Sequence, residues 1–376
     1  MRRSLAVGAA LVAALAWTVT HAEVPSEVPS VAPAPPLSPH WVFLTDAAFL
    51  HLTEGKIVIV DGDQGKVVAK LTTGYLANSL FSPDRKQMYV AETFWSRGSR
   101  GVQTDVLTVY DMATFLPVSE VVLPGRFLAV TQPFNMGLSE DGRLLYLFNM
   151  TPATSVIVVD LKAGAVVGEI STPGCALVMP AKGGFIMPCG DGTFLQLKID
   201  AAGREAGRSR TPAPVFNVDA DPISERPAVT RAGYAFTSYG GKVYEVDTSG
   251  GEPVYAAPWS LTTAEEAAAG WLPGGWEQVA YSPHSNELFV SMHQGGPGTH
   301  EQPGAEIWVY DLAGKKKVRV IKPVEGVISI AVSRDDKPIV AAITETLALS
   351  VMDAASGAET ANVPGLMELG LVLETP

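Results

Sequence analysis

Side chains that could bind a metal are few and scattered in this sequence. Five histidines follow the first 22 residues, namely His40, His51, His284, His293 and His300. His293 and His300 flank a glycine-rich segment, and Glu301 follows the second, so two imidazoles and a carboxylate could coordinate zinc. Their spacing matches no established metal pattern, and a catalytic zinc site requires three convergent ligands. We therefore expect these histidines to be ordinary polar residues of loops and expect no metal site.

The motifs of nucleophilic catalysis and phosphate binding are absent from the sequence. It contains no Gly-x-Ser-x-Gly elbow, and Gly240–Lys242 is followed by Val243 where a phosphate loop needs serine or threonine. The segment Gly190–Gly192 lacks the third glycine of a dinucleotide fingerprint. Paired acids such as Asp219 and Asp221 stand in a turn context, which explains them without catalysis. The sequence therefore predicts no catalytic residue in this chain.

The two cysteines, Cys175 and Cys189, are separated by 13 residues. An even and minimal count in an oxidising compartment favours a disulfide, while a reactive thiol or a metal-binding pair is the alternative. A disulfide closing a loop of this size would stabilise the fold by about 3 kcal/mol in the chain-entropy model. We expect a structural cross-link here.

The N-terminus predicts export. Met1–Arg3 is positively charged, Leu5–Val19 is a run of 15 apolar or small residues apart from Thr18, and Thr20–Ala22 offers a small-residue cleavage site. A membrane anchor is the alternative, but about 20 residues are needed to cross a bilayer. We therefore expect residues 1–22 to be a cleaved signal peptide and the mature protein to be periplasmic. Residues 23–39 contain six prolines and are predicted to be a disordered N-terminus.

Composition limits the class of the remaining chain, residues 40–376. A hydrophobic content of 47% with 18% charged residues predicts a large core. No later stretch is apolar enough for a transmembrane helix, so we expect no membrane span. A net charge of −12 argues against nucleic acid as a partner, because phosphate binding needs a basic surface. The length suits two domains or one radial repeat architecture.

A repeat decides between these architectures. Alternating strands end in an aspartate seven times, at Asp61, Asp111, Asp160, Asp200, Asp247, Asp311 and Asp353. The intervals of 50, 49, 40, 47, 64 and 42 residues match one four-stranded propeller blade in most cases. A β-sandwich with irregular strands is the alternative. We predict an all-β, seven-bladed β-propeller whose ring is closed by strands from both chain ends.

Two segments depart from the repeat. In the 64-residue interval, Thr263–Glu266 forms a capping box, Ala267–Ala269 favour helix and Gly270 ends it, which predicts a short helical insertion. The stretch from Phe94 to Thr104 is polar and basic, and we expect a loop there. It is either a contact surface or a solvated loop.

Specific strings resemble the large (heavy) subunit of quinoprotein amine dehydrogenases. They are His51–Lys56, Gly270–Val279, Gly298–Val309, Pro152–Ser155 and Cys189–Gly192. The third of these is closer to aromatic amine dehydrogenase (aralkylamine dehydrogenase) than to methylamine dehydrogenase. The likeness covers nearly the whole mature chain.

The resemblance implies a periplasmic heterotetramer of two large and two small subunits. Such enzymes oxidise primary amines to aldehyde and ammonia and pass electrons to a cupredoxin such as azurin or amicyanin. Their cofactor, tryptophan tryptophylquinone, is made from two tryptophans of the cysteine-rich small subunit. A chain with two cysteines resembles the other, noncatalytic subunit, which binds no cofactor itself. A methylamine dehydrogenase heavy chain and a stand-alone binding or scaffold propeller are the alternatives.

The resemblance also implies roles for named residues. Gly74–Asn78 matches a family motif whose aromatic residue lines the route to the quinone, and Tyr75 stands where the family generally has phenylalanine. The extra hydroxyl could hydrogen-bond in this substrate channel or narrow it, and a packed aromatic at a blade edge is the alternative. Phe94 and Trp95 are further candidates for the same rim. Cys175 and Cys189 match the family's intrachain disulfide.

Overall fold

The computed structural model describes residues 34–51, 53–126 and 130–376. The predicted signal peptide and the first part of the proline-rich segment lie outside the described residues. The end of that segment packs on the domain, since Leu37 contacts a hydrophobic cluster and the Ala34 N–H donates to the Ala113 carbonyl at 2.6 Å. The folded domain therefore includes residues that precede His40.

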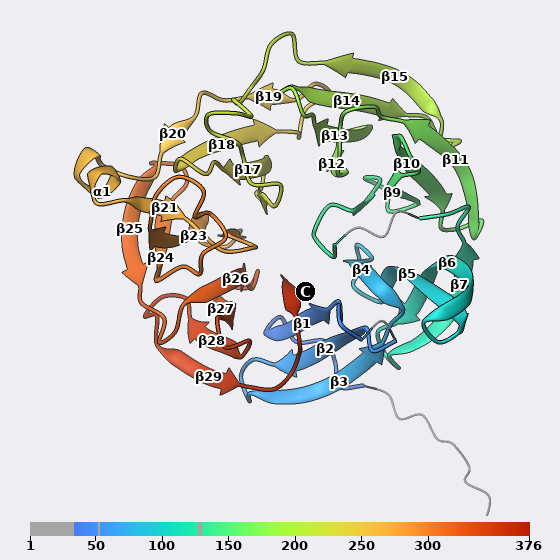
Figure 1. Ribbon diagram of the computed structural model, residues 1–376, viewed down its shortest axis with the longest axis horizontal. Coiled ribbons are helices and arrows are strands. Elements are labelled where there is room, and N and C mark those ends of the chain that lie inside the picture. The colour runs from blue at the N-terminus through green and yellow to red at the C-terminus, as the bar shows by residue number, and fades with distance from the viewer. Residues whose placement is uncertain (1–33, 52, 127–129) are drawn as a thin grey trace, which may run out of the picture. The chain divides into compact units, whose positions relative to one another are not determined.

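Within the described residues, thirty strands form seven sheets arranged as a ring, and one short helix lies outside the sheets (Figure 1). From the axis outward, blade 1 contains β30 (Gly370–Glu374), β1 (Trp41–Asp46), β2 (Lys56–Asp61) and β3 (Lys66–Thr72). Blade 2 contains β4 (Tyr75–Phe81), β5 (Gln87–Arg97), β6 (Arg100–Asp111) and β7 (Leu116–Val122). Blade 3 contains β8 (Met136–Leu138), β9 (Leu144–Met150), β10 (Thr154–Asp160) and β11 (Ala165–Ser171). The seven-bladed propeller predicted from the repeat is confirmed.

The remaining blades follow the same antiparallel order. Blade 4 contains β12 (Met179–Ala181), β13 (Gly184–Pro188), β14 (Phe194–Ile199) and β15 (Glu205–Arg210). Blade 5 contains β16 (Ala228–Val229), β17 (Gly233–Thr237) and β18 (Lys242–Asp247), with β19 (Val254–Tyr255) and β20 (Trp259–Ser260) both on β18. In blade 6, β21 (Trp271–Pro273) and β22 (Val279–Ser282) both pair with β23 (Glu287–Gln294), followed by β24 (Glu306–Asp311) and β25 (Lys316–Ile321). Blade 7 contains β26 (Val327–Val332), β27 (Ile339–Thr344), β28 (Leu349–Asp353) and β29 (Glu359–Val363).

The repeated aspartate ends the third strand of each blade or follows it directly. Its carboxylate accepts backbone N–H groups of the next turn, as Asp61 does from Asp63 at 2.9 Å and Asp311 from Gly314 at 3.0 Å. Such Asx turns reverse the chain by local hydrogen bonding. The third strand is buried along most of its length because neighbouring blades cover both of its faces. The aspartate therefore marks the turn to the exposed outer strand.

The ring closes at blade 1, where β30 from the C-terminus pairs with β1 from the N-terminal half. Asp46, at the end of β1, is fully buried. Its carboxylate accepts the N–H groups of Glu368 at 2.7 Å and Leu369 at 3.2 Å, and that of Ala48 at 3.0 Å. Lys56 lies 3.3 Å away. The predicted closure by both chain ends is thus confirmed, and the Asp46 carboxylate is one of its anchors.

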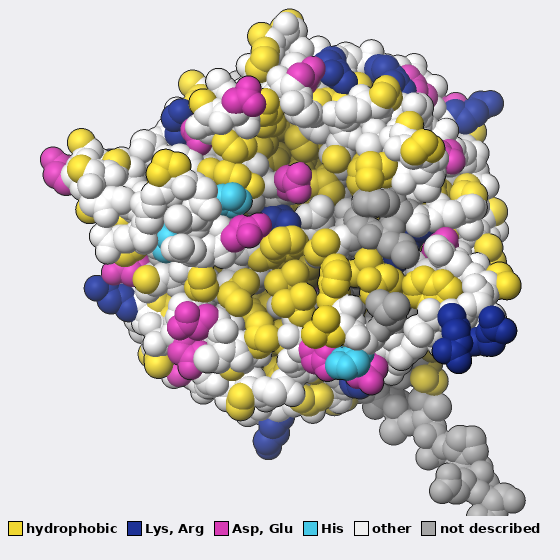
Figure 2. Space-filling view, in the orientation of Figure 1, with side chains coloured by type: hydrophobic (Ala, Val, Ile, Leu, Met, Phe, Trp, Pro, Cys, Tyr) yellow, Lys and Arg dark blue, Asp and Glu magenta, His cyan; other side chains and the backbone are white. Residues whose placement is uncertain are grey.

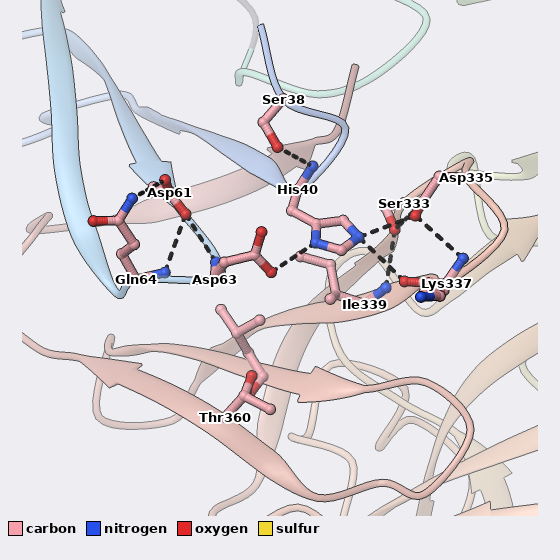
Figure 3. A network of polar contacts seen from close by, with 11 residues as sticks. Ser38, His40, Asp61, Asp63, Gln64, Ser333, Asp335, Lys337, Ile339 and Thr360 are labelled. Carbon is pink, nitrogen blue, oxygen red and sulfur yellow. Dashed lines mark hydrogen bonds and ion pairs between the residues drawn. The ribbon is translucent and has the colours of Figure 1, made fainter. Parts of the chain in front are cut away.

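A second polar contact joins blade 1 to the neighbouring blade 7, on the opposite face of the ring from Asp46 (Figure 3). The His40 ring places Nδ1 2.7 Å from Asp63 Oδ1 and Nε2 3.1 Å from Asp335 Oδ2. Burial lowers the pKa of His40, but the hydrogen bonds and negative charges of Asp63 and Asp335 outweigh it, and the pKa is raised above 6.5. The imidazolium form therefore bridges two carboxylates of different blades.

We expect His40→Gln to lower stability more at pH 6 than at pH 8.5. Because the folded-state pKa is raised, the charged histidine stabilises the fold fully below pH 6.5, and this contribution is lost as pH rises through the folded-state pKa. The expected loss at pH 6 is about 1 kcal/mol, as for partly exposed ion pairs. Urea denaturation at both pH values measures it. His284→Gln, an exposed histidine, is the control, and equal losses at both pH values would contradict the prediction.

The helix α1 (Ala264–Ala268) lies in the predicted insertion. Thr263 is its N-cap, and the reciprocal bonds of the capping box with Glu266 are both present. The helix has no buried residue, and the short helical insertion is confirmed. No helix among residues that the structure describes is long and apolar enough to cross a membrane.

The prediction of a loop between Phe94 and Thr104 is wrong. β5 and β6 continue as a paired ribbon in which Phe94 faces Thr104 and Arg97 faces Arg100. The reversal occurs at Gly98, whose φ of 68° suits glycine. Aromatic and β-branched residues carry the pairing, whereas the polar residues between them concealed the alternation.

Candidate binding face

The connections between successive blades and those between second and third strands open on one face of the ring, which we call the upper face. The β5–β6 hairpin belongs to it, as do the segments 47–55 of blade 1 and 364–370 before β30. Figure 2 views this face, and hydrophobic side chains gather on it around the axis and over blades 1 and 7. The residues expected to line a substrate route, Tyr75, Phe94 and Trp95, all lie at this face.

Tyr75 is the first residue of β4, and it is half-buried. Its ring lies against Trp95 of β5, with 5.7 Å between ring centroids and 50° between planes. Phe94 points to the opposite side of the hairpin, because successive strand residues alternate, and it is 42% exposed. The structure therefore brings Tyr75 and Trp95 together and separates Phe94 from them.

Arg126 holds the backbone beside Tyr75. Its guanidinium donates to the carbonyls of Tyr75 at 3.1 Å and Leu76 at 2.9 Å. Burial lowers the pKa of Arg126 to about 10, although the negative charges of Asp105 and Glu92 raise it in part. Leu76 has a φ of +46°, unfavourable for leucine, and the arginine holds this bend. Sequence reasoning missed Arg126, since nothing local to it points to residue 75.

Glu92 fixes the other end of the Gly74–Asn78 motif. Its carboxylate accepts the Gly74 N–H at 2.6 Å and the hydroxyl of Thr108. Burial raises the pKa of Glu92, and those two hydrogen bonds oppose the rise. Sequence reasoning also missed Glu92. An acidic residue within the otherwise apolar strand β5 could have revealed it, because a buried carboxylate needs hydrogen-bond partners. The motif is therefore held from both sides by buried charged groups.

An apolar patch lies beside this aromatic pair. Phe49 is 40% and Leu50 is 87% exposed in the β1–β2 connection, and Leu366 and Leu369 are half-buried in the segment before β30. The turn of the β5–β6 hairpin lies close to the β1–β2 connection. A Cβ added to Gly98 in that turn would be 3.7 Å from the methyl group of Thr53. Contiguous exposed apolar surface usually marks an interaction site. This patch suits contact with another protein.

The histidines considered for a metal do not converge. The Nε2 atom of His293 is 2.7 Å from the Thr299 hydroxyl, whereas His300 stacks on Tyr239 with centroids 3.7 Å apart. The one group of three possible ligands, among residues the structure describes, is His51, Glu54 and Glu368, an exposed set whose ligand atoms lie within 4.8 Å of one another. The Glu368 carboxylate, 2.8 Å from His51 Nδ1, raises the pKa of that histidine.

The predicted disulfide between Cys175 and Cys189 is present, with an S–S distance of 2.06 Å. It links the connection before β12 to the turn after β13, both in blade 4 and both on the upper face. The two sulfur-bearing side chains belong to a buried apolar cluster. The cross-link therefore fixes the upper end of one blade.

Solved β-propellers share this fold. A dihydro-heme d1 dehydrogenase, NirN, superposes with a TM-score of 0.53 at 16% identity, covering 93% of this chain and 77% of that one. The β-propeller domain of Myceliophteria thermophila Cps50 (Swd1) gives a TM-score of 0.52 at 11% identity, covering 81% and 90%. These likenesses define the class of the protein as a β-propeller and carry no information on activity.

Sequence comparison gives the family. The family model described as methylamine dehydrogenase heavy chain matches residues 39–375, so the chain belongs to that family. The heavy chain of Methylophilus methylotrophus is 30% identical over 342 residues, covering 90% of this chain and 84% of the relative. That of Methylorubrum extorquens AM1 is 29% identical over 341 residues, covering 89% and 82%. The resemblance to large subunits of quinoprotein amine dehydrogenases is confirmed.

Proposed function

We propose that this chain is the noncatalytic large subunit of a periplasmic, tryptophan tryptophylquinone-dependent amine dehydrogenase. The enzyme would oxidise primary amines, preferably aralkylamines, to aldehyde and ammonia and pass electrons to a cupredoxin such as azurin or amicyanin. Membership of the heavy-chain family over residues 39–375 carries the proposal. The apolar patch next to Tyr75 and Trp95 supports it, because a stand-alone propeller would need no such surface.

Among the residues that the structure describes, the one close pair of tryptophans is unsuited to form the quinone. A tryptophylquinone needs two adjacent tryptophans, and Trp271 and Trp308 lie with centroids 5.0 Å apart. However, Trp308 is 2% exposed, has the Lys317 ammonium over its ring and donates its indole N–H to Glu306. A substrate could not reach such a ring. We therefore assign the cofactor, which supplies the oxidation, to a small cysteine-rich partner subunit.

The contribution of this chain is a wall of the amine's route. Tyr75 and Trp95 present two tilted rings at the upper face, next to the apolar patch. Such rings contact the hydrocarbon part of an amine, and an aromatic substrate gains the most from this contact. Because Arg126 and Glu92 fix the backbone of the motif, the wall is held in place before substrate arrives.

The test is purification of the protein from its own host. The proposal expects a two-chain species that carries the visible absorption of a quinone and oxidises amines with an artificial electron acceptor. Turnover of 2-phenylethylamine above that of methylamine would support the aralkylamine preference. The reverse order would favour a methylamine dehydrogenase, the activity named for the relatives. A colourless monomer would overturn the proposal and support the binding or scaffold alternative.

We expect Tyr75→Ala in the assembled enzyme to lower kcat/KM for 2-phenylethylamine about fivefold, because one aromatic contact worth about 1 kcal/mol is removed from the route. Tyr75→Phe keeps the ring and should change kcat/KM less than about twofold. Steady-state kinetics measure both.

Phe94→Ala is the matched control for this substitution. Phe94 is an aromatic residue of the same hairpin, but it points away from the Tyr75–Trp95 pair. Its replacement should leave kcat/KM within about twofold. If Phe94→Ala had the larger effect, the assignment of Tyr75 and Trp95 to the route would be wrong.

A further inference from the structure

A cavity of about 440 Å³ lies within the ring, lined by residues of the innermost strands. Most of its wall is apolar and comes from blades on all sides of the axis. Representative wall residues are Leu80, Phe134, Met136, Val279 and Ile330. A cavity of this size and lining is typical of sites for small organic molecules.

Five arginine and glutamate side chains line this axial cavity, namely Arg85, Arg226, Glu277, Arg334 and Glu374. Each glutamate is bound to a neutral group, Glu277 to the Leu373 N–H at 2.8 Å and Glu374 to the Ser79 hydroxyl at 3.1 Å. Within the described part of the chain, no arginine of the cavity forms an ion pair within 4.0 Å. The positive charges are therefore not neutralised by direct contact.

Burial raises the pKa of Glu277 to about 8 and that of Glu374 to about 7. Both carboxyls are thus largely or partly protonated at neutral pH. Three arginines then outweigh them, and the cavity is positive although the chain carries a net charge of −12. Glu225 and Glu301 also act on Arg226 through space, without an ion pair.

The donor groups at the Arg226 end lack acceptors. The guanidinium of Arg226 stacks on Trp276, with Cζ 3.4 Å from the ring centroid. Both Arg226 Nε and Trp276 Nε1 are buried and bind no protein acceptor among the residues described. The remaining contact of this guanidinium is a long one, 3.5 Å to the Trp276 carbonyl. These two nitrogens are enclosed by the protein, so the terminal N–H groups of Arg226, which lines the cavity, are the donors left for a ligand there.

Arg85, in the turn between β4 and β5, is another arginine of the cavity wall. It has a φ of +58° and stacks over Phe81, with 5.0 Å from Cζ to the ring centroid. No hydrogen bond from its guanidinium is found in the described structure. Burial lowers the pKa of Arg85, with Glu374 opposing the shift. The turn thus brings a second unpaired cation to the cavity wall.

We propose that the axial cavity binds a small organic monocarboxylate. Its carboxylate would accept hydrogen bonds from the terminal N–H groups of the Arg226 guanidinium, and its hydrocarbon part would lie against the apolar wall. A planar guanidinium suits a carboxylate because two parallel N–H···O bonds can form. All these groups belong to this chain, so the site does not depend on the proposed dehydrogenase activity or on a partner.

Isothermal titration calorimetry on the mature protein, with the subunits that co-purify, tests the proposal. Phenylacetate is the probe. 2-Phenylethanol has a similar hydrocarbon part without a charge, acetate has the charge without the ring, and phosphate is an inorganic anion. We expect phenylacetate to bind at least tenfold more tightly than each of the three. Absence of heat with phenylacetate, or equal affinity for the alcohol or for phosphate, would overturn the proposal.

Variants locate the binding site. Arg226→Met should weaken phenylacetate at least tenfold, and Arg226→Lys should give an intermediate loss. Arg97→Met, an exposed arginine of the hairpin, is the control and should stay within twofold. If Arg226→Met does not fold, Arg226→Lys decides, since it keeps the positive charge but loses the paired N–H groups and must weaken phenylacetate more than Arg97→Met does. Unchanged binding in a folded variant of Arg226 would refute the site.

Discussion

Replacing Asp46 by alanine is expected to lower the free energy of unfolding by about 3 kcal/mol or more. The buried carboxylate accepts three backbone N–H groups, two of them from the segment that leads into the closing strand β30. Without it these donors and the Lys56 ammonium lose their partner inside the ring closure. Urea denaturation at pH 7 measures the loss.

The same carboxylate gives the prediction a pH signature. Burial would raise the pKa of Asp46, but the N–H groups of Glu368, Ala48 and Leu369 outweigh it, and the pKa lies below 3.8. A lowered folded-state pKa means that the contribution is present above pH 3.8 and is lost as pH falls through the folded-state pKa. Wild type should therefore converge on the variant in acid, and a constant difference down to the lowest pH would contradict this account.

Asp336→Ala is the matched control for Asp46→Ala. It removes an exposed aspartate of blade 7, the other blade at the closure. Its effect should lie within about 0.5 kcal/mol, as for most surface substitutions. A loss for Asp46→Ala as small as that of the control would show that pairing of β30 with β1 closes the ring without the anchor.

The second large effect is expected for the disulfide. Replacing both Cys175 and Cys189 by alanine should lower the free energy of unfolding by about 3 kcal/mol, because the unfolded chain regains the freedom of a closed loop with 13 intervening residues. Alanine is chosen because both side chains lie in an apolar cluster where a hydroxyl would be unpaired. Thermal denaturation with and without reductant measures the change.

Reductant provides the internal control for the disulfide. It should destabilise wild type by about as much as the double substitution does, and it should leave the double variant unchanged. A wild type whose stability is insensitive to reductant under denaturing conditions would mean that the cross-link contributes little beyond the packing of blade 4.

The architecture could be predicted because its signals are local. The seven aspartates bind N–H groups within a few residues of themselves, so the turn that ends each third strand is encoded where it occurs. The capping box of α1 is equally local, with Thr263 and Glu266 satisfying each other's backbone. The hairpin from Phe94 to Thr104 was missed because its strands are paired with each other and largely exposed, so polar residues are tolerated in them.

The sequence by itself determined the seven blades, the short helix, the cysteine pair and the family likeness. The tertiary structure decided how distant residues meet: Arg126 on the carbonyl of Tyr75, Asp46 on Glu368 across 322 positions, and Glu277 on Leu373. In a closed ring each blade is packed on blades formed elsewhere in the chain, and a buried charge is paired with whichever group the closure brings to it. Such partners leave no periodic trace in the sequence, because they are chosen by geometry and by the cost of burying an unpaired polar group.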